Sequence, residues 1–206
     1  MSPLHQPEAT RARILEAALE LFHTRTFNGT SINEIVEKAG ITKGALFHHF
    51  KGKVDLGYAV IDGPLRRKIN ETWTRPLTAS VDPVTDILAI IASFSEEVDV
   101  DSENSPESLS HGCPLNNLAQ ELSTQDQGFR EKLTAIYDEW QNAIEQAFCA
   151  GVEAGNVRPD VDPKIAATSI VAFLEGCIGT IKVYQNKDHM SCLGQGLGIF
   201  LNSMRP

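Results

Sequence analysis

The chain has 206 residues, an apolar content ordinary for a soluble globular protein, and a formal net charge of −9. That length allows one large domain or two small ones. No run of about 18 consecutive apolar residues occurs and the first residues form no apolar signal core, so we expect a cytoplasmic protein without a membrane span. The four cysteines form no paired motif and do not combine with the six histidines at zinc-finger spacing. The sequence therefore predicts neither a disulfide framework nor a metal site.

The charge is divided unevenly along the chain. Residues 1–68 hold ten Lys and Arg against seven Asp and Glu, whereas residues 69–206 hold eight against twenty. A mildly basic N-terminal part joined to an acidic remainder is typical of a protein that meets nucleic acid at one end only.

Hydrophobic periodicity predicts helices throughout, with no convincing alternating strand pattern. The first helix is expected at about 8–26. Two short helices follow, joined by a tight turn at Gly40, which can adopt the left-handed conformation of a C-cap. The first of the two begins with the capping box Ser31-x-x-Glu34, and Thr42 caps the second.

The remainder predicts about six further helices. The helix from Lys53 is expected to bend at Gly63-Pro64 and to end before Pro76. The polar segment 99–112 predicts a loop. The other expected helices are 82–98, 114–123, 125–154, 163–187 and 190–204. The longest carries a regular apolar seam formed by Phe129, Leu133, Ile136, Trp140, Ala143 and Ala147.

Residues 31–50 form a helix-turn-helix pattern, in which the second helix enters the major groove of DNA. Leu46 and Phe50 are expected to face the core. The opposite face offers a cation, a bare backbone, an aromatic ring and a ring donor, which can contact phosphates, base edges and thymine methyl groups. Arg11 and Arg13 near the start of the first helix could hold phosphate across the groove. Periodicity alone predicts equally well a plain helical hairpin with solvated lysines.

Residues 9–56 closely resemble the N-terminal domain of the TetR family of repressors. The matching segments are Ile14-Leu15-x-Ala17-Ala18-x-x-Leu21-Phe22, Thr30-Ser31-Ile32-x-x-Ile35, Ala39-Gly40-Ile41-Thr42-Lys43-Gly44 and Leu46-Phe47-x-His49-Phe50-x-x-Lys53-x-x-Leu56. The resemblance implies an all-α fold with a three-helix DNA-binding domain at 1–52. A ligand-binding and dimerisation domain of about six helices follows at 53–206.

The resemblance also implies which residues meet DNA. We expect contacts from Ser31, Thr42, Lys43, Gly44, Phe47, His48, His49 and Lys53. Phe47 departs from the family pattern, which usually has tyrosine there. Phenylalanine keeps the ring but loses the hydroxyl that can bond a phosphate.

The last two helices are the expected homodimer interface. Residues 165–183 are apolar nearly all round, and small residues among them allow another helix to approach closely. A four-helix bundle across a two-fold axis would cover every side of such a helix. The alternative is that these helices form the interior of one protomer.

Sensing of a small-molecule inducer is expected in the C-terminal domain. The candidate lining residues are Trp73, Phe94, Tyr137, Trp140 and Phe148, although aromatic residues at helical spacing are more often plain core. The sequence does not identify a ligand.

Cys113 lies in the segment His111-Gly112-Cys113-Pro114, directly before a proline that can begin a helix. A thiol at a helix N-terminus has a lowered pKa, and His111 is close enough to assist. The longer segment Gly112-Cys113-Pro114-Leu115-x-Asn117-Leu118 also resembles the body of a TetR subgroup that includes the electrophile-responsive repressor NemR. We therefore predict that Cys113 senses an electrophile or oxidant, with Lys182 as a counter-ion. The alternative is a buried packing thiol, with a Lys182 side chain that reaches water.

These observations predict a homodimeric, ligand-responsive transcriptional repressor that binds a palindromic operator in double-stranded DNA, with no catalytic residue and no cofactor. A thiol-dependent enzyme is a weaker alternative, because the sequence has no nucleophile elbow and no phosphate-binding loop. A small-molecule-binding protein without operator binding is a third option. The intact stretch from Thr42 to Lys53 argues against it.

Overall fold

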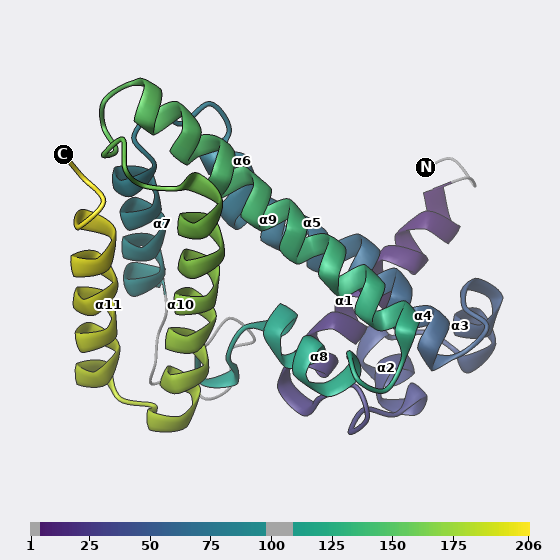
Figure 1. Ribbon diagram of the computed structural model, residues 1–206. Helices are drawn as coiled ribbons and strands as arrows, with labels where there is room; N and C mark the ends of the chain where they lie inside the picture. The colour runs from purple at the N-terminus through teal and green to yellow at the C-terminus, as the bar shows by residue number, and fades with distance from the viewer. Residues whose placement is uncertain (1–4, 98–108) are drawn as a thin grey trace. The chain divides into compact units, whose positions relative to one another are not determined.

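The computed structural model describes residues 5–97 and 109–206, and every regular element in these two stretches is helical (Figure 1). The predicted all-α class is therefore confirmed. Most of the loop expected at 99–112 lies outside the described residues. Its end, Leu109–His111, forms a short 3-10 helix, η3. The described chain forms two compact units, one from residues up to Arg67 with Pro114–Thr134, the other from Lys68–Cys113 with Ala135–Pro206.

The first unit contains the three helices of the predicted DNA-binding domain together with further helices. Its N-terminal helices are α1 (His5–Arg25), α2 (Ile32–Ala39), α3 (Lys43–His49) and α4 (Lys53–Val60). It also includes α8 (Pro114–Leu122) and the start of α9 (Gln127–Glu153). Its fully buried side chains include Ile14, Phe22, Ile35, Leu46, Leu56 and Phe129. This compact unit is thus larger than residues 1–52.

From α4 the chain stays helical to Leu77 with two π-helical turns. The run continues through η1 (Ile61–Leu65), α5 (Arg66–Ile69), η2 (Asn70–Thr74) and α6 (Arg75–Leu77). Pro64 lies in the first π turn, and the second directly precedes the helix that contains Pro76. Proline has no N–H to donate, and a π turn accommodates the missing hydrogen bond. The predicted end before Pro76 is therefore wrong, since that proline occupies a tolerated first-turn position of α6.

The second unit is built from α7 (Pro83–Glu97), the rest of α9, α10 (Pro163–Tyr184) and α11 (Lys187–Asn202). Trp140, Ile144 and Phe148 of α9 are completely buried. The apolar seam predicted for α9 is buried from Phe129 to Ala147, except that Ala143 is only half-buried. The periodicity therefore identified the buried face of this helix correctly.

α10 is long and apolar enough to cross a membrane by length and composition alone. A core helix of a soluble protein passes the same test, so this is weak evidence for a span. The α10 side chains that are buried here, among them Ile170, Val171 and Leu174, pack inside the second unit.

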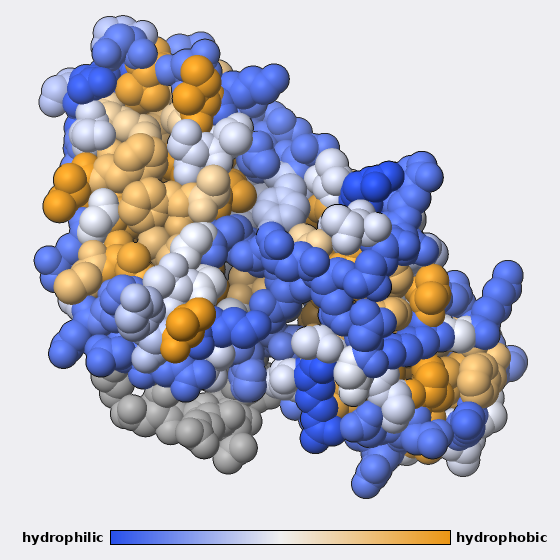
Figure 2. Space-filling model, turned by 60° about the horizontal axis from the view of Figure 1, so that its bottom comes forward, coloured by the Kyte–Doolittle hydropathy of each residue, from blue (hydrophilic) through white to orange (hydrophobic). Residues whose placement is uncertain are grey.

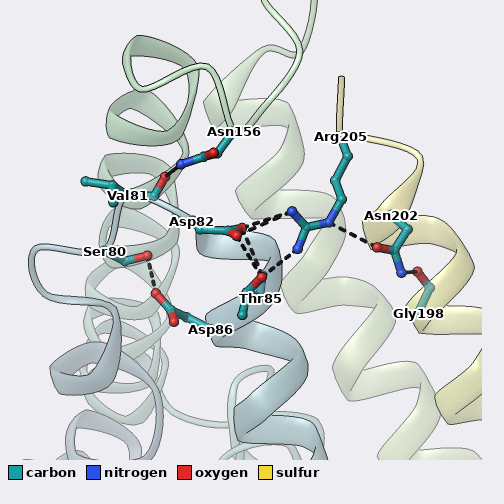
Figure 3. Close-up of polar contacts among 9 residues, drawn as sticks. All are labelled: Ser80, Val81, Asp82, Thr85, Asp86, Asn156, Gly198, Asn202 and Arg205. Carbon is teal, nitrogen blue, oxygen red and sulfur yellow. Dashed lines mark hydrogen bonds and ion pairs between the residues drawn. The ribbon is translucent and has the colours of Figure 1, made fainter.

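The C-terminus is fastened to the start of α7 (Figure 3). The Arg205 guanidinium pairs with the Asp82 carboxylate, with Nη1 3.3 Å from Oδ1, and donates to the Thr85 hydroxyl at 2.6 Å. Asp82 also caps α7, because its Oδ1 accepts the Thr85 N–H at 3.1 Å. Burial opposes the shift, but the Thr85 hydrogen bonds and the Arg205 charge hold the pKa of Asp82 below its usual value. This C-terminal clasp joins α7 to the end of α11.

Candidate nucleic-acid interface

The turn between α2 and α3 is set by local chemistry. Ser31 caps α2 and forms the full capping box with Glu34, as predicted. Gly40 ends α2 in the left-handed conformation, with φ 60°, and its N–H donates to Glu37 O at 3.0 Å. The Thr42 hydroxyl accepts the Ala45 N–H at 3.2 Å and so begins α3. These contacts fix the direction in which α3 leaves the turn.

α3 has one buried and one exposed face. Leu46 is completely buried and Phe50 is 3% exposed, which confirms the predicted core face. Five residues predicted to meet DNA have exposed side chains or, for glycine, exposed backbone: Thr42, Lys43, Gly44, Phe47 and His48. His49 is half-buried. The Phe47 ring is 47% exposed and so is available to a partner.

Ser31 and the arginines of α1 have structural partners. The Ser31 hydroxyl is exposed but already accepts the Glu34 N–H at 3.2 Å. The Arg13 guanidinium donates to Gly40 O at 2.9 Å and also to Ala39 O, so it caps the end of α2. The Arg11 guanidinium lies 5.3 Å from the centre of the Phe50 ring. The expected role of the arginines as phosphate ligands therefore competes with their role in holding the helix-turn-helix together.

Lys53 is held against the turn that joins α1 to α2. Its ammonium lies 4.7 Å from the centre of the Phe27 ring and 3.4 Å from Asn28 O. Burial lowers the pKa of Lys53, while the charges of Glu121 and Glu34 oppose that shift. The lysine is half-buried, so it is pre-positioned rather than freely mobile.

Cys113 lies in a buried, acidic setting in the second unit. It follows Gly112, which has a φ of 78°, and it is only 9% exposed. Burial, followed by the charge of Glu175 and an electrostatic interaction with Cys113, strongly raises the pKa of Tyr137. The Tyr137 hydroxyl lies 3.4 Å from Glu175 Oε1. Cys113 and Glu175 therefore both interact electrostatically with Tyr137.

Sequence reasoning missed Glu175. It is 8% exposed and lies on the same apolar helix, α10, as Lys182. The available signal was an acidic residue at a position where α10 is otherwise apolar. Glu175 and Lys182 are seven residues apart, which places them on one side of the helix, and the Lys182 side chain is exposed.

Three of the predicted lining aromatics come together. The Trp73 and Trp140 rings are 5.0 Å apart, and those of Tyr137 and Trp140 are 6.5 Å apart and stacked. Trp140 is completely buried, and its indole Nε1 has no hydrogen-bond partner among the described residues. The side chain of Phe94, on α7, lies outside the described residues.

Trp73 also borders an apolar cavity of about 90 Å³. The rest of its lining comes from α7, α10 and α11: Ile91, Leu174, Cys177, Ile178, Ile181, Met190, Leu193, Gly194 and Leu197. Burial raises the pKa of the Cys177 thiol, so this wall carries no thiolate at neutral pH. Within the described stretches, no group of three or more His, Cys, Asp or Glu side chains is arranged to hold a metal ion.

Apolar side chains also gather on the outside of α10 and α11. Ile165, Val183, Tyr184 and Ile199 are each at least 60% exposed. Figure 2 shows apolar residues concentrated over the part of the second unit that these two helices form. An added Cβ at Gly176, Gly179, Gly194 or Gly196 would meet nothing within 4 Å. This surface is therefore apolar and sterically open.

Two family models match the chain. Residues 14–60 match bacterial regulatory proteins of the tetR family, and residues 87–196 match the tetracyclin repressor-like C-terminal domain. The HTH-type transcriptional repressor DhaR of Mycobacterium sp. strain GP1 is 26% identical over 199 residues, covering 95% of this chain and 92% of DhaR. The regulator TtgR of Pseudomonas putida is 28% identical over 180 residues, covering 84% and 80%.

Solved structures agree with this fold. A TetR transcriptional regulator from Chloroflexus aurantiacus has a TM-score of 0.80 at 27% identity, covering 97% of this chain and 98% of its own. The reduced form of E. coli NemR has a TM-score of 0.76 at 18% identity, covering 92% and 95%, which is a likeness of fold alone. These matches do not support the thiol-enzyme alternative, because they are to non-enzymatic DNA-binding regulators. The chain belongs to the tetR family of bacterial regulatory proteins.

Proposed function

We propose that this protein is a homodimeric transcriptional repressor in the cytoplasm that binds a palindromic operator and is released by a small-molecule inducer. The observation that carries the proposal is that α3 has one buried face and one exposed face. Leu46 and Phe50 anchor the helix, while the residues expected to meet base edges and phosphates remain exposed. The same helix in two protomers would enter two successive major grooves about 34 Å apart.

The exposed faces of α10 and α11 support the dimer. Their apolar side chains and open glycines offer the close approach that a helix from a second copy needs. A second protomer would bury this surface and fix the spacing of the two α3 helices. A palindromic operator then follows from the two-fold symmetry of the dimer.

Electrophile sensing is proposed at Cys113, because a covalent adduct on this buried thiol would force its neighbours to move. We propose that the sulfur adds to the β-carbon of an activated alkene while the thiol proton is transferred to the α-carbon, so that no further reactant is required. A bulky adduct on a thiol that is 9% exposed cannot be accommodated without movement of its neighbours. The residues that we expect to respond to such an adduct are His111, Tyr137, Trp140, Trp73 and, as a counter-ion, Lys182.

Selection of bound sequences from random duplex DNA tests the proposal. We expect the natural protein to enrich a palindrome whose half-sites are about 10 base pairs apart, centre to centre, or a multiple of that. Lys43→Ala and Thr42→Ala should enrich it much less. If the natural protein enriches no sequence over these variants, the protein binds a small molecule without operator binding and the proposal is wrong.

A further inference from the structure

The turn between α1 and α2 is tightly constructed. Thr26 adopts a left-handed backbone with φ 70°. The buried Thr30 hydroxyl donates to Thr26 O at 2.7 Å. A Cβ at Gly29 would lie 2.3 Å from Arg25 O, so only glycine fits there. Because Ser31 caps α2 directly after this turn, the turn determines where the helix-turn-helix begins.

A carboxylate from α8 binds this turn. Glu121 Oε2 accepts the Phe27 N–H at 2.8 Å, and Oε1 accepts the Asn28 N–H at 2.7 Å. The two N–H groups therefore share one carboxylate. Hydrogen bonds to an ionised acceptor are roughly twice as strong as neutral ones. Glu121 is half-buried, which reduces screening by solvent.

Lys53 binds the same turn from its carbonyl side. Its ammonium lies 3.4 Å from Asn28 O and over the Phe27 ring. The charge of Glu121 favours the charged form of Lys53. Glu121 and Lys53 thus hold the same two residues, the former through their N–H groups and the latter through a carbonyl and a ring.

We propose that Glu121 is a positioning residue for operator binding. By fixing the Phe27–Asn28 turn it holds the Lys53 ammonium where a phosphate can meet it at the N-terminus of α4. The inference rests on the proposed operator binding and adds a residue outside the helix-turn-helix to it. Glu121 itself touches no DNA in this account. Its effect passes through Lys53.

Glu121→Gln tests the inference, with Glu131→Gln as the matched control. The control removes the same charge from the same compact unit, at an exposed residue whose partner is the Gln127 amide. In Glu121→Gln, the side-chain amide has only one oxygen to accept the Phe27 and Asn28 N–H groups. We expect Glu121→Gln to weaken binding of the selected operator about tenfold, the size of one charge-assisted hydrogen bond. The control should bind as the natural protein does.

A double-mutant cycle distinguishes positioning from general loss of structure. In a Lys53→Gln background, Glu121→Gln should have little further effect on operator affinity. Additive losses, or unchanged affinity in Glu121→Gln, would overturn the proposal. Failure of the natural protein to bind any selected duplex would instead refute the proposed function.

Amide hydrogen exchange in the full chain keeps the test independent of variant folding. The Phe27 and Asn28 amides should be protected in the natural protein and should exchange faster in Glu121→Gln, while the amides within the helices are unchanged. If these two amides exchange in the natural protein as fast as a free peptide does, Glu121 does not hold the turn and the inference is wrong.

Discussion

At the scale of single residues, the setting of each cysteine separates the four thiols. Cys149 and Cys192 are exposed, whereas Cys113 and Cys177 are buried. Burial raises the pKa of Cys177. Cys113 interacts electrostatically with Tyr137, whose hydroxyl lies 3.4 Å from the Glu175 carboxylate, and a reaction of the thiol would disturb this pair. Modification of Cys113 is therefore expected to disturb DNA binding, although the exposed thiols should react sooner.

The first prediction concerns release of the operator by N-ethylmaleimide. Cys149→Ser is the control and should lose its operator as the natural protein does, because the exposed Cys149 lies twelve residues from Tyr137 along α9. Cys113→Ser should keep its operator at reagent concentrations that release the natural protein. Fluorescence anisotropy of the labelled operator measures the release. Normal release of the Cys113→Ser variant would refute the sensing role.

Residues with local partners were predicted well. The Ser31 capping box, the Gly40 C-cap and the Thr42 cap depend on neighbours within four residues, so their sequence spacing was sufficient. The partners of Arg13 and Glu121 lie 26 and 94 residues away, and no local pattern connects them. The apolar periodicity of α10 identified a buried helix but not the buried carboxylate of Glu175. Charged residues inside an apolar helix are explained only by partners from other helices.

At the scale of elements, α4 is held in the first unit by close packing against α9 and the turn between α1 and α2. A Cβ at Gly57 would lie 2.7 Å from a Phe27 ring carbon and 2.8 Å from a Phe129 ring carbon. These two rings pack against each other with centroids 5.1 Å apart. No side chain fits at Gly57 without moving them.

Gly57→Ala should therefore destabilise the protein by about 1–3 kcal/mol, the usual cost of overpacking. Gly63→Ala is the matched control, because its Cβ would meet only a Leu15 methyl carbon at an ordinary 3.8 Å. It should be neutral or stabilising by up to about 1 kcal/mol through helix propensity. Urea denaturation measures both. Equal effects of the two substitutions would contradict this packing.

The C-terminal clasp between Asp82 and Arg205 gives stability that depends on pH. The pKa of Asp82 is lowered in the folded state, so its contribution is present above the pKa of the unfolded chain and is lost as pH falls through the folded value. Asp82→Asn should lower the unfolding free energy at neutral pH. The difference from the natural protein should shrink below about pH 4, where an unperturbed aspartate becomes protonated.

Urea denaturation between pH 7 and pH 3 checks this difference. Asp160→Asn is the control, because its ion pair with Arg158 is largely exposed and should contribute little at any pH. A difference for Asp82→Asn that stays constant over the whole range would show that the clasp does not titrate as described.

At the scale of the whole molecule, the apparent conflict between an acidic protein and an acidic ligand is resolved by where the charges lie. The excess of Lys and Arg is confined to the N-terminal part of the sequence, which contains α3. The all-α fold and the family were predicted from the sequence, because helical periodicity and a long ungapped motif are both local signals. The enlarged first unit was not, because α8 and the start of α9 join it from a distant part of the chain.

The most direct measurement is titration of the selected palindrome, a single half-site and a scrambled duplex with the natural protein at physiological salt. We expect two protomers on each palindrome and affinity for it about 10³-fold or more above that for the scrambled duplex. Affinity should fall steeply as salt rises. Equal affinity for the palindrome and the scrambled duplex would contradict the account.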